Sequence, residues 1–260
     1  MAVIGLLHPG EMGAAVGACL VTAGHAVLWD PAKRSPATAK RADAAGLTAA
    51  PLASIVQRAE VILSVCPPHA ALEVAGQVAA TGFGGTYVDA NAVAPATAAQ
   101  VSEAATAGGA KYVDGGIVGA PPVTAGTTRL YLSGDGALEI AELFAGTVVE
   151  VRVLTAGPYA ASALKLSYAS WTKGSAALLL AARELARAEG VDEDLLAEWR
   201  TSQPALLAQW ERADVSRRTK GWRWIGEMEE IAASMRADDL PDGFHHAAAQ
   251  IFGRAYPSLE

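Results

Sequence analysis

The chain has 260 residues, of which 52% are hydrophobic and 18% are charged, and its formal net charge is -7 at pH 7. This composition can bury a large core and excludes a disordered or fibrous protein, while the length suits a nucleotide-binding domain followed by a smaller one. The negative charge, with no long stripe of Lys and Arg, argues against nucleic acid as a partner. The two cysteines, Cys19 and Cys66, lack metal-ligand spacing, and we interpret them as reduced core thiols in a cytoplasmic protein.

Residues 1–157 alternate short β-branched runs with Ala-rich helical stretches, as repeated βα units require. No run of about 18 apolar residues and no signal peptide is found, so no membrane association is expected. The predicted strands are Ala2–Leu7, His25–Trp29, Val61–Val65, Thr86–Asp89, Lys111–Val113, Arg129–Ser133 and Val148–Val153. Continuous apolar runs such as Val61-Ile62-Leu63 suit strands covered on both faces. The pattern predicts an α/β fold, a Rossmann-type doubly wound sheet.

The sequence pattern changes after Gly157. Residues Pro158–Glu189 form a long and mostly apolar helical stretch, and Gly190 ends it. The further predicted helices are Asp192–Trp199, Pro204–Arg212, Gly221–Met235 and Asp242–Tyr256. We therefore expect residues 158–260 to form an all-α domain for substrate binding and dimerisation, with its first helix leading out of the nucleotide domain.

The turn His8-Pro9-Gly10-Glu11-Met12-Gly13 lies between the first predicted strand and helix. A dinucleotide turn needs small residues where the chain bends, where the backbone meets the pyrophosphate, and where the helix meets the strand. Gly10 and Gly13 take two of these places, but His8 takes the first, so the motif alone is weak. A tight turn without a ligand is the alternative. We predict that these six residues hold cofactor phosphates at the helix N-terminus.

The residues after the second strand bear on the choice of cofactor. Asp30 is placed to bond the ribose hydroxyls of NAD. Lys33, Arg34 and Ser35 follow, and two cations with a hydroxyl suit a ribose 2′-phosphate. We expect NADP, with NAD as the alternative; in a further interpretation Asp30 begins a turn and both cations are solvated.

Four motifs follow one another along the chain: Gly10-Glu11-Met12-Gly13, the stretch 87–95, the segment 114–134, and Gly157 with Lys165. With these motifs the sequence resembles the β-hydroxyacid dehydrogenase and imine reductase superfamily, especially its 6-phosphogluconate-dehydrogenase-like members with a compact helical C-terminal domain. The resemblance runs nearly end to end. It implies hydride transfer at a nicotinamide and a homodimer whose helical domains complete each other's active sites.

Lys165 falls on the catalytic lysine of the superfamily. It is the first charge on a mostly apolar helix, and burial there would lower its pKa towards neutrality and make it a general acid/base. The alternative is a lysine that extends its amine from a core helix to solvent.

Three positions depart from the resemblance. Val118 replaces a serine in the segment 114–120, which we predict to be a substrate loop, Ala169 replaces an asparagine, and Ala92 replaces a serine or threonine. The backbone N–H groups of Gly119 and Ala120 remain able to cradle an oxyanion. The pocket is expected to be more apolar than usual.

The remaining predicted contacts lie at strand ends and in the helical domain, and no metal site is predicted. Further cofactor contacts are Cys66, Pro67 and Asn91; the candidate substrate contacts are Asn91, Val118, Gly119, Ala120, Tyr168, Thr172, Trp222 and His245. For each of Asn91, Tyr168 and His245 an ordinary structural role is the alternative.

These features predict an NAD(P)-dependent oxidoreductase acting on a small alcohol or carbonyl substrate of β-hydroxyacid dehydrogenase type. Reduction of an imine is the rival reaction, because the missing serine and asparagine favour a substrate without the usual carboxylate. A redox sensor that binds NAD(P) without turnover is a lesser alternative, because a fold does not determine its function.

Overall fold

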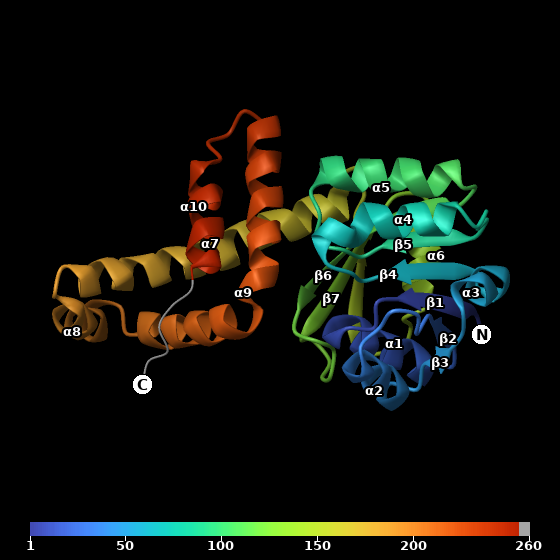
Figure 1. The fold of residues 1–260 in the computed structure, drawn as a ribbon, viewed down its shortest axis with the longest axis horizontal. Coiled ribbons are helices and arrows are strands. Elements are labelled where there is room, and N and C mark those ends of the chain that lie inside the picture. The colour runs from blue at the N-terminus through green and yellow to red at the C-terminus, as the bar shows by residue number, and fades with distance from the viewer. Residues whose placement is uncertain (255–260) are drawn as a thin grey trace. The chain divides into compact units, whose positions relative to one another are not determined.

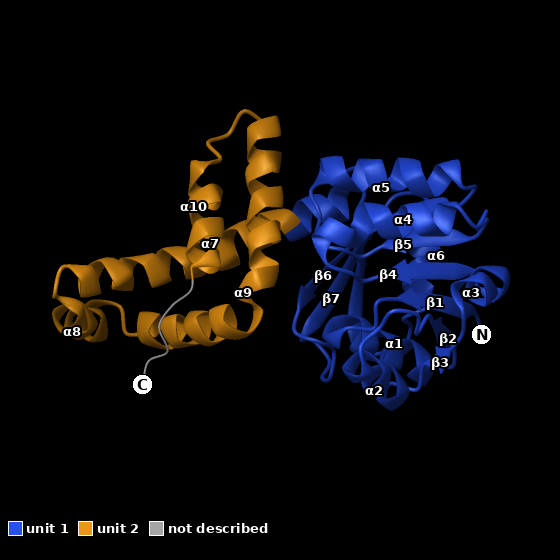
Figure 2. Ribbon diagram, in the orientation of Figure 1, with its two compact units in different colours: residues 1–165 blue, residues 166–260 orange. Residues whose placement is uncertain are grey.

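The structure is a computed structural model in which residues 1–254 are described, so the predicted helix end at Tyr256 lies outside the described residues. The chain divides into two compact units, residues 1–165 and residues 166–260 (Figure 2). The division falls within the long helix α7 (Ala160–Ala188). No described helix has both the length and the apolar character needed to cross a membrane.

Unit 1 is built on one eight-stranded sheet with the order β3-β2-β1-β4-β5-β6-β7-β8. All neighbouring strands are parallel except β6 and β7. The strands are β1 (Val3–Leu7), β2 (Ala26–Trp29), β3 (Thr48–Ala49), β4 (Val61–Ser64), β5 (Thr86–Asp89), β6 (Lys111–Gly119), β7 (Thr128–Ser133) and β8 (Val149–Val153). The Rossmann-type architecture predicted from the sequence is thereby confirmed.

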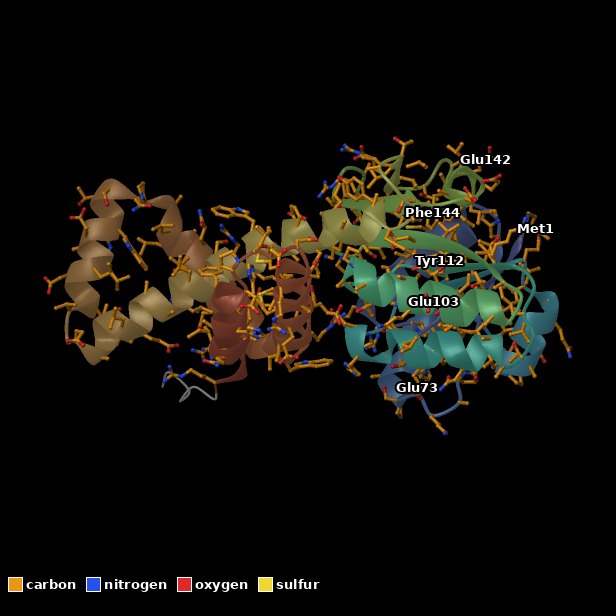
Figure 3. The ribbon with its side chains drawn as sticks, turned by 90° about the horizontal axis from the view of Figure 1, so that it is seen from above. Met1, Glu73, Glu103, Tyr112, Glu142 and Phe144 are labelled. Carbon is orange, nitrogen blue, oxygen red and sulfur yellow. The ribbon has the colours of Figure 1, made fainter. Side chains whose placement is uncertain are left out.

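Helices cover both faces of the sheet, because its central strands are apolar on both sides. These helices are α1 (Glu11–Thr22), α2 (Pro36–Ala44), α3 (Leu52–Arg58), the 3₁₀ turn η1 (Pro68–Ala70), α4 (Ala71–Ala79), α5 (Pro95–Ala107) and α6 (Ala137–Glu142). One buried cluster joins residues of α1, α2 and α6 to the sheet, and a second joins α4 and α5 to the opposite face (Figure 1). Figure 3 looks onto α4 and α5, on the face where Tyr112 packs.

Two strand predictions need correction. The predicted strand at 111–113 extends to Gly119, so the expected substrate loop at 114–120 is mostly strand; residues 114–119 pair antiparallel with residues 128–133. The local sequence does not show this, because the partner strand comes later in the chain. The strand β3 was missed because it is two exposed residues at the sheet edge without an apolar run.

Unit 2 consists of the remainder of α7 with α8 (Asp192–Ser202), α9 (Ala205–Ala237) and α10 (Gly243–Gly253). The helical nature of this part and the single long helix from the start of α7 agree with the sequence-based prediction. The two helices expected at 204–212 and 221–235 are instead one helix, α9. Asp214 pairs with Arg217 and Arg218 within the intervening stretch and supports the helix there.

Candidate functional site

The predicted cofactor contacts lie at one edge of the sheet. Strand order reverses between β1 and β4, and ligands of doubly wound sheets bind at the carboxyl ends of the strands beside such a reversal. The structure brings four segments to this edge: residues 8–13 after β1, residues 30–35 after β2, Cys66 and Pro67 after β4, and Asn91 after β5.

The turn after β1 has the geometry of a phosphate cradle. His8 has a φ of 66°, a left-handed conformation that favours glycine, and its carbonyl oxygen accepts a bond of 2.7 Å from the Gly10 N–H. Gly10 caps α1 without offering a side chain to the first turn, and a Cβ at Gly10 would meet no atom within 4 Å. A Cβ at Gly13 would lie 2.5 Å from the His8 carbonyl oxygen. The open space and the uncapped helix N-terminus fit a dinucleotide pyrophosphate.

His8 itself is a neutral imidazole at neutral pH. Burial, and secondarily the charge of Arg34, lower the pKa of His8 to about 4. Its Nδ1 atom is buried without a hydrogen-bond partner among the described residues. The same Arg34 charge acts on the Cys66 thiol, whose pKa burial raises to about 12. Arg34 therefore acts electrostatically at the ends of both β1 and β4, and Cys66 is a neutral thiol rather than a nucleophile.

The residues after β2 divide into two groups. Asp30 accepts the Ala32 N–H at 2.9 Å, and Ser35 caps α2 by accepting the Thr38 N–H at 3.2 Å. Lys33 and Arg34 are exposed. Asp30 and Ser35 thus shape the backbone, while the two cations follow β2 and are exposed to solvent.

The side chain of Asn91 connects the ends of β4 and β5 through hydrogen bonds. Its Oδ1 atom accepts the Cys66 N–H at 2.5 Å, and its Nδ2 atom donates to Ser64 Oγ at 3.1 Å and to Asp89 Oδ1. Only 2% of Asn91 is exposed. Because its oxygen accepts the Cys66 N–H while its amide group is held by Ser64 and Asp89, Asn91 holds the backbone of Cys66 at the cofactor edge.

A row of buried polar residues crosses the sheet at the level where β4 and β5 end. Ser64 pairs with Asp89, Asp89 with Asp114, and Asp114 with Ser133 on successive strands. Burial, with a smaller contribution from the charge of Asp114, raises the pKa of Asp89 to about 7 against the opposing hydrogen bonds from Asn91, and burial also raises the pKa of Asp114. Asp89 and Asp114 were not among the predicted site residues, although the tripeptide Tyr-Val-Asp occurs at both places and could have indicated them.

Asp114 holds the beginning of α7. Its Oδ2 atom accepts the Ser162 N–H at 2.8 Å and the Ser133 hydroxyl at 2.9 Å, and its Oδ1 atom accepts the Ser162 hydroxyl at 2.5 Å. The half-buried Lys165 follows on the same helix. A Cβ at Gly116 would lie 2.9 Å from the Lys165 Cβ, so the helix packs closely on β6 at this point.

The three predicted contacts at 118–120 lie at the end of β6. Val118 is buried and pairs with Arg129, and Gly119 pairs with Thr128 at a φ of 118°. A Cβ at Gly119 would clash with the backbone of Thr127, so only glycine fits there. The carbonyl oxygen of Ala120 accepts the Thr128 hydroxyl at 2.6 Å.

The predicted contacts of unit 2 occupy three different environments. Tyr168 and Thr172 line a cavity of about 510 Å³ between α7 and α9, together with Trp224. Trp222 is exposed. His245 is buried, and its Nε2 atom lies 3.0 Å from Ser170 Oγ.

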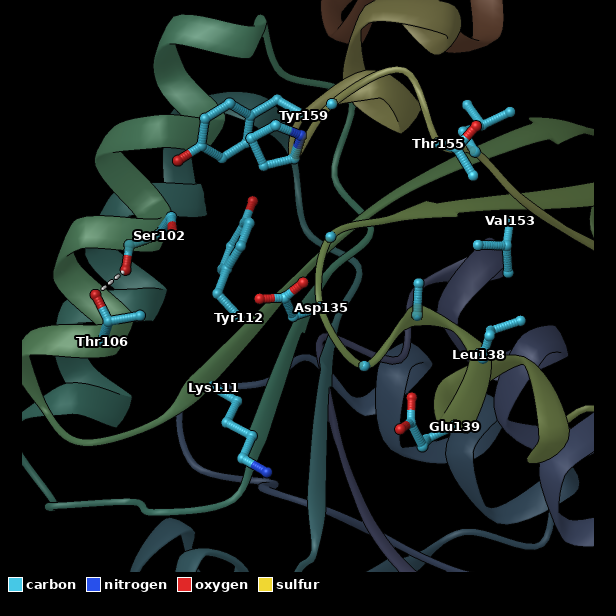
Figure 4. A pocket seen from close by; sticks show the side chains of 16 residues that line it. Ser102, Thr106, Lys111, Tyr112, Asp135, Leu138, Glu139, Val153, Thr155 and Tyr159 are labelled. Carbon is cyan, nitrogen blue, oxygen red and sulfur yellow. Dashed lines mark hydrogen bonds between the residues drawn. The ribbon is translucent and has the colours of Figure 1, made fainter.

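A larger cavity of about 1040 Å³ lies away from the cofactor edge (Figure 4). It is lined by Lys111 and Tyr112 at the start of β6 and by Asp135 after β7, with the Tyr159 ring in edge contact with Tyr112. None of the predicted site residues lines it. Because it adjoins the amino end of β6, it is separate from the edge that carries the glycine turn.

Residues 1–141, more than half of the chain, match the family model of the NAD binding domain of 6-phosphogluconate dehydrogenase. The chain belongs to this family. As a member, it is an NAD(P)-dependent dehydrogenase or reductase, which confirms the enzyme class predicted from its motifs. Residues 186–255 match a second model, a domain of unknown function designated DUF1932.

Several solved structures are similar to the chain over nearly its whole length. One is a conserved protein of unknown function described as similar to 3-hydroxyacid dehydrogenases, with 26% identity, a TM-score of 0.71, and coverage of 96% of this chain and 95% of that one. Another is 3-hydroxyisobutyrate dehydrogenase of Mycobacterium tuberculosis, with 19% identity, a TM-score of 0.70, and coverage of 97% and 93%.

A third is the reductive aminase of Aspergillus terreus, solved with NADPH4, cyclohexanone and allyl amine, with 20% identity, a TM-score of 0.60, and coverage of 98% of this chain and 93% of that one. No curated protein sequence matches the chain. At these low identities the last two structures support the fold alone.

Proposed function

We propose that this protein transfers a hydride between NADP(H) and a small alcohol or carbonyl substrate of β-hydroxyacid type, with Lys165 as general acid/base. The observation that carries the proposal is the packing of Lys165 on Gly116. Gly116 lies two residues beyond Asp114, which is in register with Asp89, the last residue of β5. The lysine backbone is therefore near the carboxyl edge where ligands of such sheets bind.

The proposed chemistry needs one proton-transfer group beside the reacting carbon. The Lys165 amine accepts the alcohol proton in oxidation and returns it to the carbonyl oxygen in reduction. When bound, the nicotinamide accepts or supplies the hydride. The backbone N–H groups of residues 10–13 would hold the pyrophosphate at the start of α1.

The preference for NADP is supported by the two exposed cations after β2. Lys33 and Arg34 carry charge that a ribose 2′-phosphate would neutralise, and guanidinium geometry suits phosphate. Asp30, the residue expected to select NAD, is engaged with the Ala32 backbone.

Reduction of an imine is the second candidate. Val118 is buried at the end of β6 and Ala169 is buried on α7, so the hydroxyl and amide expected of hydroxyacid dehydrogenases are missing at these positions. A substrate without a carboxylate has less need of those groups. The acid/base role of Lys165 is common to both reactions.

A homodimer through the helical unit is supported by an exposed stripe on α7. Trp171, Leu178 and Leu185 are exposed and recur every seven residues, with the small Ser175 and Ala182 between them. This is the spacing of a helix seam that packs against another helix. We further propose a cytoplasmic location, which the two buried and unpaired cysteine thiols support.

The deciding experiment follows nicotinamide absorbance with a panel of 3-hydroxy acids in the oxidative direction and of aldehydes, ketones and cyclic imines in the reductive direction. For the best substrate, Lys165→Ala is expected to lower kcat by about 10² to 10⁴-fold, as loss of a general acid/base does. NADPH affinity, measured by fluorescence, should be retained. Lys40→Ala, at an exposed lysine of α2, is the matched control. Full turnover by Lys165→Ala would disprove the assigned role.

A further inference from the structure

The start of α7 is attached to β6 at two points. At the first, the Asp114 carboxylate accepts both the N–H and the hydroxyl of Ser162. Asp114 also accepts the Ser133 hydroxyl, and the Ser133 oxygen in turn accepts the Ala161 N–H at 3.0 Å. All three polar side chains are buried, with 1% exposure or less. Such bonds are costly to break because the separated groups would be left unpaired.

The second point of attachment is two residues further along β6. A Cβ at Gly116 would lie 2.6 Å from the Ala161 carbonyl oxygen and 2.9 Å from the Lys165 Cβ. Backbone and side chain of the helix thus occupy the space that any other residue would need. Glycine at this position sets the distance between α7 and the strand.

The two attachments together determine where Lys165 lies. A second contact on the same helical turn restricts rotation of the helix about the first. Lys165 is three residues after Ser162, or about 4.5 Å along the axis, so little flexibility separates it from the anchor. The Asp114 side chain also accepts the Ser162 N–H, one of the N–H groups at the helix start that have no partner within the helix.

From this geometry we infer that Asp114 is the positioning residue for Lys165, acting through Ser162 and aided by Gly116. The inference rests on the proposed function, in which Lys165 exchanges the proton. It assigns to the geometry of β6 a purpose in placing the amine, in addition to its part in folding. Removing the anchor should therefore change the environment of Lys165 while leaving the glycine turn and its cofactor contacts in place.

The first test measures Lys165 without any substrate. The full chain is labelled with acetic anhydride over the pH range in which lysines titrate, and mass spectrometry reads the rate at each lysine. In Ser162→Ala and Gly116→Ala the pH profile of Lys165 is expected to differ from that of the wild type, while Lys40 on α2 keeps its profile. Gly76→Ala, where a Cβ would meet nothing within 4 Å, is the matched glycine control.

The second test uses the substrate identified by the panel. A misplacement of about 1 Å costs on the order of 10²-fold in rate, so Asp114→Asn and Ser162→Ala should lose kcat by a similar factor with NADPH affinity unchanged. In a Lys165→Ala background, adding Asp114→Asn should cause no further loss, because the anchor then has no amine to place. Ser162→Ala, the mildest change, serves if Asp114→Asn fails to fold.

The outcomes separate the two proposals. Unchanged Lys165 labelling and unchanged kcat in folded Ser162→Ala and Gly116→Ala would overturn the positioning role, even if Lys165→Ala is inactive. Equal losses from Asp114→Asn with and without Lys165 would also overturn it. Full turnover by Lys165→Ala would instead overturn the proposed function, whatever the labelling shows.

Discussion

Asp89 and Asp114 lie in register on the adjacent parallel strands β5 and β6, and both carboxyl groups are buried. Asp89 holds Asn91 and, through it, the backbone at Cys66, whereas Asp114 holds the first turn of α7. One pair of neighbouring acids thus supports both the cofactor edge and the helix that carries Lys165. Two neighbouring carboxyl groups in a buried site disfavour simultaneous ionisation.

The first prediction concerns stability and pH. The pKa of Asp89 is about 7 in the folded chain, mainly because of burial, while an unfolded aspartate titrates near 3.8. Between these values the folded chain binds a proton that the unfolded chain does not, so the free energy of unfolding falls as pH rises through this window. Relative to Asp89→Asn, the wild type should lose about 1.4 kcal/mol per pH unit there. Urea denaturation at a series of pH values measures the difference.

The control for Asp89 is Glu103→Gln, at an exposed carboxylate of α5. Its stability curve should run parallel to that of the wild type over the whole window. Parallel curves for Asp89→Asn as well would show that Asp89 titrates as an ordinary acid, contrary to the prediction.

The second prediction concerns the left-handed backbone of His8. His8→Gly and His8→Ala both remove the ring, but only alanine must adopt a φ of 66° with a Cβ. We expect the free energy of unfolding of His8→Ala to be lower than that of His8→Gly by about 1 kcal/mol. Thermal or urea unfolding of the pair measures this value. Equal stability of the two variants would contradict the strain assigned to this position.

The third prediction concerns cofactor choice. Arg34→Ala should weaken NADPH binding by about tenfold or more, since a charge-assisted bond contributes about 1.5 to 3 kcal/mol. NADH binding should change little, because NADH has no 2′-phosphate. Fluorescence titration with both cofactors measures the two affinities, with Lys40→Ala as control. An equal loss for NADH and NADPH would assign Arg34 to a part common to both cofactors.

The fourth prediction concerns assembly. Leu178→Glu puts a charge in the middle of the exposed stripe of α7 and is expected to shift a dimer towards monomer in light scattering. Leu72→Glu, at an exposed leucine of α4, should leave the mass unchanged. A monomeric wild type, or a Leu178→Glu protein that is still dimeric, would rule out this seam.

Much of the fold was predictable because its signals are local. Apolar runs such as that of β4 predict buried strands, and the long stretch with few charges predicts α7, since periodicity and composition act within a few residues. The glycine turn was recognisable for the same reason, because Gly13 packs against the backbone of His8, only five residues earlier in the chain. At Gly221, by contrast, local sequence suggested the beginning of a helix, but the stretch before it continues α9.

Only the tertiary structure revealed the roles of the buried polar residues. Ser64, Asp89, Asp114 and Ser133 lie on four strands far apart in sequence, and register alone aligns them. Likewise, β6 extends past residue 113 because β7 pairs with it, and Ser162 meets Asp114 across 48 positions of the chain. The sequence by itself determined the Rossmann-type fold, the enzyme class and the candidate Lys165. The packing of α7 on β6 decided what holds that lysine, because hydrogen bonds between distant segments form only when the chain is folded.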